Sequence, residues 1–234
     1  MNQESIISII LPAYNEDKNL EILIPKIYHA VKNRVFLSHE IIVVNDGSID
    51  NTELVLINLI KEIKTLRVIN LKKRMGQSFA VWEGVKRAEG DLILTKDADF
   101  QTDPEEIPMM IENLKEFDMV CGYRKNRNDS YSKRISSIIA NRVRRIVLRG
   151  NIIDSACGFK VFKKKCINNM EFFDGMHRFM PDLFLIHNFK VRQVEVRHYP
   201  RVHGETKYNI KNRLGKALKD LIMVKKIKNK KNNL

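Results

Sequence analysis

The feature that most constrains the fold is a regular alternation of short apolar, β-branched segments with segments whose apolar residues recur at helical spacing. The first pair is residues 6–11, ended by Pro12, followed by helical spacing from residue 20 to residue 31. The alternation occurs five times, with strands expected at 6–11, 40–44, 66–71, 91–95 and 117–122. Such alternation is typical of a mostly parallel sheet with helices on both faces. We therefore expect an α/β sheet sandwiched by helices.

Several helices of this layout carry individual signals. The helix after residue 51 is expected to place Leu54, Ile57, Ile60 and Ile63 on one face. Pro104 suits the first turn of another helix.

The second half is less regular. We expect a helix with a basic face at 135–148, a strand at 159–162, a helix at 178–187 and a strand at 191–196. A final amphipathic helix carries an apolar stripe of Leu214, Leu218, Leu221 and Ile222 among lysines. This predicts a main domain over 1–212, with a small subregion in its less regular second half, and a basic C-terminal helix and tail over 213–234.

Acidic and polar side chains follow four of the five strands. In open α/β sheets, ligands bind in the crevice at the carboxyl ends of the strands. The rim residues expected there are Pro12, Tyr14, Asn15, Glu16, Asn45, Asp46, Asp97, Asp99, Gln101, Tyr123 and Arg124.

The triplet Asp97-Ala98-Asp99 directly follows the fourth strand. Two carboxylates separated by one residue suit a divalent cation such as Mg²⁺ or Mn²⁺, which keeps other positions for water and substrate phosphates. The alternative is an exposed acidic turn, which occurs by chance in many proteins. Its place beside Asp46 and Glu16 at the end of a buried strand favours the metal site.

Other nucleotide-binding and hydrolytic motifs are absent from the sequence. There is no Gly-x-Gly-x-x-Gly after the first strand, no Gly-x-x-x-x-Gly-Lys-Ser/Thr and no Gly-x-Ser-x-Gly. A bound phosphate would therefore be held by a metal and by basic side chains.

The net charge of +14 is concentrated in two segments. Residues 124–149 carry nine Lys/Arg and one Asp, net +8, and residues 207–234 carry ten Lys/Arg and one Asp, net +9, which leaves net −3 for the rest. Such patches attract phosphates of nucleotides, lipids or nucleic acids, although they can also be simply solvated.

The order of six motifs carries a family resemblance. Residues 11–16 (LPAYNE), 43–52 (VVNDGSIDNT) and 97–101 (DADFQ) resemble the family 2 inverting glycosyltransferases of the GT-A fold. Residues 154–162 (DSACGFKVF) and 201–207 (RVHGETK) resemble the dolichyl- or polyprenyl-phosphate sugar synthases, and 175–179 (GMHRF) resembles their bacterial-type members. The resemblance extends over about residues 5–210, and it implies that the small subregion of the second half lies on the acceptor side.

This resemblance implies a role for each matching residue. Nucleotide binding is implied for Pro12, Tyr14, Glu16, Val44, Asp46, Asp97, Ala98, Arg201 and Lys207. A Mg²⁺ or Mn²⁺ ion would be held by Asp97, Asp99 and Gln101. The catalytic candidates are Asp99 and Arg124, and the acceptor-phosphate candidates are Arg134 and Ser136.

The implied reaction moves a sugar from a UDP- or GDP-linked donor to polyprenyl phosphate with inversion. Because a phosphate is already ionised near pH 7, no dedicated general base is required, and Asp99 is the fallback candidate. A family 2 enzyme with a saccharide or other acceptor is the alternative. A non-catalytic nucleic-acid-binding protein is a third hypothesis, which the acidic rim argues against.

Two departures from the relatives are visible. Asn45 stands where many relatives have a second acid, and the chain stops in a Lys/Asn-rich end where many continue into membrane spans. Its apolar runs are shorter than the ~20 residues of a span, there is no signal-peptide pattern, and three cysteines without metal-site spacing fit a reducing compartment.

We therefore expect a peripheral protein on the cytoplasmic face of a membrane, with a membrane-spanning partner as one option. The final helix either lies on an anionic bilayer or packs on the domain. His177 and His203 are left open as ligands, bases or hydrogen-bonded structural residues.

Overall fold

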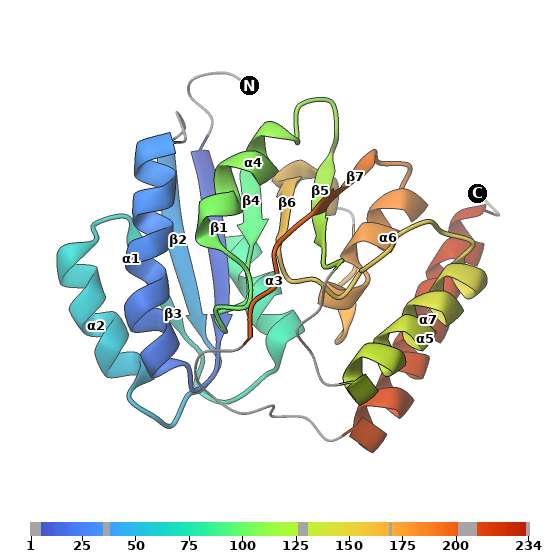
Figure 1. Cartoon of the computed structure of the whole chain (residues 1–234), viewed down its shortest axis with the longest axis horizontal. Coiled ribbons are helices and arrows are strands. Elements are labelled where there is room, and N and C mark those ends of the chain that lie inside the picture. Colours follow the sequence, from blue (N-terminus) through green and yellow to red (C-terminus); the bar gives the residue numbers. More distant parts are fainter. Residues whose placement is uncertain (1–5, 35–37, 126–130, 169, 201–209, 233–234) are drawn as a thin grey trace.

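A single sheet forms the centre of the molecule (Figure 1). The structure is a computed structural model that describes residues 6–34, 38–125, 131–168, 170–200 and 210–232. The strands in these ranges are β1 (Ile6–Ala13), β2 (Ser38–Asn45), β3 (Leu66–Asn70), β4 (Leu92–Thr95), β5 (Met119–Tyr123), β6 (Lys160–Lys163) and β7 (Val191–Glu195). The α-helices are α1 (Asp17–Arg34), α2 (Thr52–Glu62), α3 (Gln77–Arg87), α4 (Ile107–Glu112), α5 (Tyr131–Leu148), α6 (Met180–Ile186) and α7 (Ile210–Asn232). The 3₁₀ turns are η1 (Pro104–Glu106), η2 (Lys164–Ile167) and η3 (Met176–Arg178).

The strand order is β3-β2-β1-β4-β6-β5-β7. Only β6, among the strands described, runs antiparallel to its neighbours β4 and β5. The remaining pairs are parallel, so the expected mostly parallel α/β sheet is confirmed. The reversal at β6 was not predicted, because the order in which strands pair leaves little trace in local periodicity.

Successive residues of β1 face opposite layers of helices, as the pleat requires. Ile9 packs into a core with Leu23 of α1, whereas Ile10 packs into a second core with Val85 of α3. Figure 1 shows α1 and α2 beside the β1–β3 half of the sheet. Helices α6 and α7 contribute to the second core, which closes the other face.

One glycine permits the close approach of α3 to the sheet. A Cβ built on Gly84 would lie 2.6 Å from Cγ2 of Ile10 and 3.2 Å from Cγ2 of Val44. Both contacts are shorter than side chains tolerate without moving, so the helix can lie this close only because residue 84 lacks a side chain.

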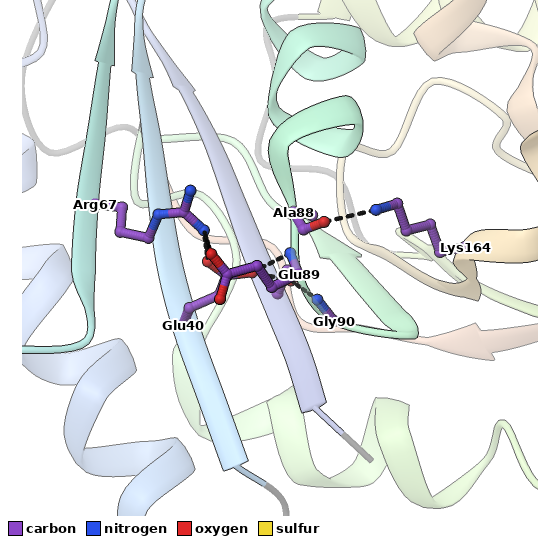
Figure 2. Close-up of polar contacts among 7 residues, drawn as sticks. Glu40, Arg67, Ala88, Glu89, Gly90 and Lys164 are labelled. Carbon is purple, nitrogen blue, oxygen red and sulfur yellow. Dashed lines mark hydrogen bonds and ion pairs between the residues drawn. The ribbon is translucent and has the colours of Figure 1, made fainter.

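A buried carboxylate connects β1, β2 and β3 near the amino ends of these strands (Figure 2). Glu40 on β2 accepts hydrogen bonds from Ser8 Oγ at 2.5 Å, from the backbone N–H of Glu89 at 2.6 Å and from Nη1 of Arg67 at 2.5 Å. Ser8 Oγ also accepts from the N–H of Gly90 at 2.9 Å. This network joins β1, β2, β3 and the turn before β4.

The face of α2 that carries Leu54, Ile57 and Ile60 is not the one that packs on the core. Leu56 and Leu59 pack into the core, whereas Leu54, Ile57 and Ile60 are exposed by 58%, 48% and 38%. Ile63, the residue after the end of α2, is buried. The segment carries apolar residues on more than one face, so periodicity alone cannot select the one that meets the sheet.

Helix α7 packs on the domain through part of its apolar stripe. Leu221 and Val224 belong to the second core, whereas Leu218 and Ile222 are exposed. The helix begins at Ile210, and the division of the chain at residue 213 stays a prediction. Among the described residues, no helix combines the length and the apolar character that a membrane span needs.

Candidate functional site

The carboxyl ends of β1, β2 and β4 meet at one edge of the sheet. Ala13 is in register with Asn45, and the N–H of Asp46 donates to the carbonyl of Ala13 at 2.8 Å. On the other side of β1, the N–H of Lys96 donates to the carbonyl of Ile10 at 3.1 Å. The loops that carry the expected rim residues are therefore neighbours.

The loops after β1 and β2 are bonded to each other. Asn15 adopts a left-handed conformation (φ 54°), and its N–H donates to Ser48 Oγ at 2.9 Å while its Oδ1 accepts from the N–H of Ile49 at 2.9 Å. The N–H of Glu16 donates to Oγ1 of Thr52 at 3.0 Å, and Glu16 Oε2 accepts from Nδ2 of Asn19 at 2.6 Å. These bonds hold the strand ends as one rigid edge.

Asn45 has a physical reason to be an amide. Its Oδ1 accepts from the N–H of Ser48 at 3.1 Å, while its Nδ2 donates to Oδ1 of Asn70 at 3.0 Å. An ionised aspartate has no proton to donate to Asn70. The departure from an acid at this position therefore serves the link between β2 and β3.

The carboxylate of Asp46 fixes the loop before α3. Its two oxygens accept from the N–H groups of Met75 at 2.6 Å and Gly76 at 2.9 Å. The guanidinium of Arg74, in the same loop, lies 4.1 Å above the ring of Tyr14. Arg74 thus joins the rim as a cation that the motif reasoning missed, and the run Lys72-Lys73-Arg74 was the available signal.

The Asp97–Gln101 segment leaves β4 through a strained turn. Phe100 has φ 61°, which is unusual for a bulky residue. Asp99 Oδ1 accepts from the N–H of Gln101 at 3.2 Å, and Asp97 Oδ1 accepts from Nε2 of Gln77 at 2.7 Å. Burial raises the pKa of the Asp97 carboxyl, and the nearby charge of Asp99 raises it further.

A buried lysine lies beside the two aspartates. Nζ of Lys96 donates to the carbonyl oxygen of Thr102 at 2.7 Å and to its Oγ1 at 2.5 Å. Burial lowers the pKa of Lys96 to about 8, although the charges of Asp99 and Asp97 oppose this shift. Lys96, which directly follows β4, therefore links the end of that strand to Thr102, just beyond the Asp97–Gln101 turn.

Arg124, at the end of β5, forms a two-point ion pair with Asp154. Nε lies 2.7 Å from Oδ2, and Nη2 lies 3.0 Å from Oδ1. The side chains are only 11% and 5% exposed. Asp154 was recognised only as part of a motif, and its pairing with Arg124 joins residues thirty positions apart that no local pattern connects.

His177 faces the same region from η3. Its Nδ1 lies 2.5 Å from Ser78 Oγ, which in turn accepts from the N–H of Gly175 at 2.8 Å. His177 also lines a small cavity of about 10 Å³ with Asp97, Gln77 and Lys160. The contact with Ser78 agrees with the role of a hydrogen-bonded structural residue, one of the three roles left open for His177.

Fewer contacts are described for the remaining expected site residues. The side chains of Val44 and Ala98 are buried in the core, whereas Pro12 lines the cavity. Arg134 and Ser136 belong to α5, but their side chains are not among those described. Residues outside the described ranges are Arg201, His203 and Lys207.

The segment before Arg201 is attached to the rim. The N–H of Tyr199 donates to the carbonyl of Gln101 at 2.9 Å, and Nε2 of Gln101 lies 3.5 Å from the carbonyl of Tyr199. The chain thus enters residues 201–209 from a point beside the Asp97–Gln101 turn.

The sequence of this chain is similar to those of several bacterial enzymes. The chain is 32% identical over 229 residues to a dodecaprenyl-phosphate galacturonate synthase of Rhizobium johnstonii, covering 93% of this chain and 66% of the relative. It is 31% identical over 207 residues to an undecaprenyl-phosphate 4-deoxy-4-formamido-L-arabinose transferase of Aeromonas hydrophila subsp. hydrophila, covering 88% and 63%. The chain thus spans less than two thirds of the length of these relatives.

Solved structures share the fold. The glucosyl-3-phosphoglycerate synthase of Mycobacterium tuberculosis, in complex with Mn²⁺, UDP and phosphoglyceric acid, superposes with a TM-score of 0.70 at 21% identity. The match covers 94% of this chain and 77% of that one. Residues 8–170 match the family described as Glycosyl transferase family 2, so the chain belongs to this family and has its GT-A fold.

Proposed function

We propose that this protein transfers a sugar from a nucleotide-sugar donor to polyprenyl phosphate with inversion at the sugar carbon. The observation that carries the proposal is the convergence of Asp97, Asp99 and Gln101 with the loops after β1 and β2 at one edge of the sheet. The names of the matched relatives, both polyprenyl-phosphate sugar transferases, support the acceptor.

The donor set at this edge fits a hard divalent cation. Two carboxylates and the amide oxygen of Gln101 are oxygen ligands, which Mg²⁺ and Mn²⁺ prefer. No cluster of three or more His, Cys, Asp or Glu that could enclose a metal occurs in the part of the chain described. A cation held by two carboxylates and one amide oxygen would keep further coordination positions for the oxygens of a diphosphate. This agrees with the Mn²⁺ and UDP of the mycobacterial enzyme.

A bound Mg²⁺ or Mn²⁺ would supply positive charge to the leaving nucleoside diphosphate. In the reaction, an oxygen of the acceptor phosphate forms a bond to the sugar carbon while the bond from that carbon to the diphosphate oxygen breaks. The electron pair leaves with the diphosphate, and the acceptor phosphate, already ionised, needs no deprotonation. Asp99 is the fallback base for an acceptor that arrives protonated.

The rim cations would stabilise charge on the two phosphate groups. Arg124 is held in place by Asp154, so its position is fixed before substrate binds. Arg74 is held against Tyr14 on the donor side. We assign Arg201 and Lys207 to the phosphates, and Arg134 and Ser136 to the acceptor phosphate.

We further propose that the protein works at a membrane surface, through α5 and α7. These helices contact each other and lie side by side (Figure 1). Exposed apolar side chains on them are Ile138, Ile139, Val143, Ile146, Leu218, Ile222 and Met223. Basic residues accompany them, including Arg142, Arg145, Lys219 and Lys226. Apolar side chains flanked by cations suit the interface of an anionic bilayer.

We place this surface on the cytoplasmic face of the membrane, where nucleotide sugars are the donors. A membrane-spanning partner protein would supply spans that the described helices lack. We expect nucleic acid not to be a partner, because carboxylates line the rim.

The test is a transfer assay with purified protein, Mn²⁺ or Mg²⁺, a panel of UDP- and GDP-sugars and polyprenyl phosphate in detergent. A lipid-linked sugar that forms only with metal is the expected result. Transfer to a saccharide but never to polyprenyl phosphate would contradict the acceptor assignment. Full activity in EDTA would contradict the metal.

A further inference from the structure

The carboxylate of Asp97 is confined by two residues from other segments of the chain. Nε2 of Gln77 donates to Oδ1 at 2.7 Å. In addition, a Cβ built on Gly158 would lie 2.4 Å from Cγ and from both carboxylate oxygens. The carboxylate therefore occupies space that only a glycine at 158 leaves open, and it points an oxygen at the Gln77 amide.

Gln77 is itself fixed by the opposite side of the rim. It is the first residue of α3, and it follows Gly76, whose N–H donates to Oδ2 of Asp46. Gly76 has φ 94°, a conformation that favours glycine. A continuous path of bonds thus runs from Asp46 through the Met75–Gly76 backbone to Gln77 and on to Asp97.

The choice of an amide has a chemical consequence. A glutamine donates a hydrogen bond without carrying charge, so it orients the carboxylate and leaves its negative charge uncompensated. A lysine or arginine at hydrogen-bond distance would instead neutralise that charge. With one lone pair of Oδ1 accepting from Gln77, the remaining lone pairs of the carboxylate are available to an ion. Hydrogen-bond partners of this kind set the orientation and basicity of metal-ligating groups.

We infer that Gln77 is a positioning residue for the divalent cation, holding the Asp97 carboxylate in the orientation in which it meets the ion. The inference rests on the proposed function. Through the bonds from Asp46, it also couples the nucleotide side of the rim to the metal side. Neither the Asp97 triplet nor the family motifs point to Gln77.

The test measures Mn²⁺ binding directly, by electron paramagnetic resonance of the free ion, in the presence of UDP or GDP. Gln77→Met keeps the length of the side chain and removes the donor. We expect its dissociation constant for Mn²⁺ to rise about 10- to 100-fold, with kcat at saturating Mn²⁺ reduced much less. Gln193→Met is the matched control, since Gln193 hydrogen-bonds to the backbone of Asn151 and Ile153 rather than to Asp97.

Gly158→Ala tests the second wall without altering α3. The added methyl meets only the movable end of Asp97 among its nearest atoms, so the carboxylate is expected to rotate away while the protein stays folded. Mn²⁺ binding should weaken in this variant too, and thermal unfolding of both variants verifies folding. Should Gln77→Met fail to fold, Gln77→Leu, which also lacks the donor, takes its place in the same Mn²⁺ titration.

Wild-type Mn²⁺ affinity in a folded Gln77→Met protein would overturn the inference and leave the transferase proposal standing. Wild-type affinity in Gly158→Ala would likewise overturn it. Absence of sugar transfer by the wild-type protein would instead refute the proposed function, which separates the two failures.

Discussion

The guanidinium of Arg124 and the carboxylate of Asp154 form a buried two-point ion pair that joins the end of β5 to the segment before β6. Removing one partner of such a pair leaves a buried charge without compensation, which typically costs about 3–5 kcal/mol. We therefore expect Asp154→Ala to lower the free energy of unfolding by about 3 kcal/mol, measured by urea denaturation.

The matched control for this prediction is the exposed pair of Lys216 and Asp174, whose side chains are 51% and 57% exposed. Asp174→Ala should change the free energy of unfolding by less than about 1 kcal/mol. Equal effects of the two substitutions would mean that the Arg124–Asp154 pair is not specially stabilising.

The buried carboxylate of Glu40 should make stability depend on pH. Burial by itself would raise its pKa, but the hydrogen bonds from Ser8, the Glu89 N–H and Arg67, with the charge of Arg67, together lower it below 4.5. A lowered folded-state pKa contributes stability above the unfolded-state pKa, and this contribution is lost as the pH falls through the folded value. Glu40→Gln should therefore destabilise the protein at pH 7 by about 1–3 kcal/mol.

Comparing unfolding free energies at pH 7 and at about pH 3.5 tests this assignment. The gap between wild-type protein and Glu40→Gln should narrow at the lower pH. Glu62→Gln, on the exposed end of α2, serves as the control and should alter neither value. A gap independent of pH would show that Glu40 stabilises by shape rather than by charge.

Gly84 and Gly215 should respond to alanine in opposite ways. Both lie within helices, where alanine is favoured over glycine by roughly 1 kcal/mol. A Cβ at Gly84 would meet Ile10 at 2.6 Å, whereas a Cβ at Gly215 would meet nothing within 4 Å. Gly84→Ala should destabilise by about 1–3 kcal/mol and Gly215→Ala should stabilise, as read from thermal unfolding. Stabilisation by both would mean that α3 can move away from the sheet.

Asp99→Asn probes the proposed metal site. The substitution keeps the shape and removes the charge, so turnover should fall roughly 10²- to 10³-fold while the unfolding temperature is retained. Asp103→Asn is the control, because Asp103 caps η1 by accepting from the N–H of Glu105 at 3.0 Å. Unchanged turnover in Asp99→Asn would exclude Asp99 from the chemistry.

The sequence was sufficient for the elements and for the edge of the sheet where the rim residues gather. Buried β-branched runs mark the parallel strands, and Pro104 begins η1 as expected. Contacts between side chains that are distant in the sequence could not be predicted. The spacing of apolar residues and their secondary-structure propensities do not indicate which loops lie next to each other. The pairing of Gln77 with Asp97 and the exposed face of α2 both belong to this class.

The α5–α7 surface gives the last prediction. Ile138 and Ile146 on α5 are 58% and 68% exposed, so changing both to serine removes apolar area without opening the core. If this surface meets a bilayer, the double variant should bind vesicles of mixed neutral and anionic phospholipid at least about tenfold more weakly, since each side chain contributes about 1.5–3 kcal/mol when fully buried.

The control is the double variant Leu54→Ser with Ile57→Ser, because these α2 residues are exposed to a similar degree, 58% and 48%. It should bind vesicles like the wild-type protein in a sedimentation assay. Point variants are preferable to removing the tail, because Leu221 and Val224 of α7 lie in the core and their loss would disturb the fold. Equal weakening by both double variants would contradict a membrane role for α5, since the loss would then follow apolar exposure in general rather than one face of the protein.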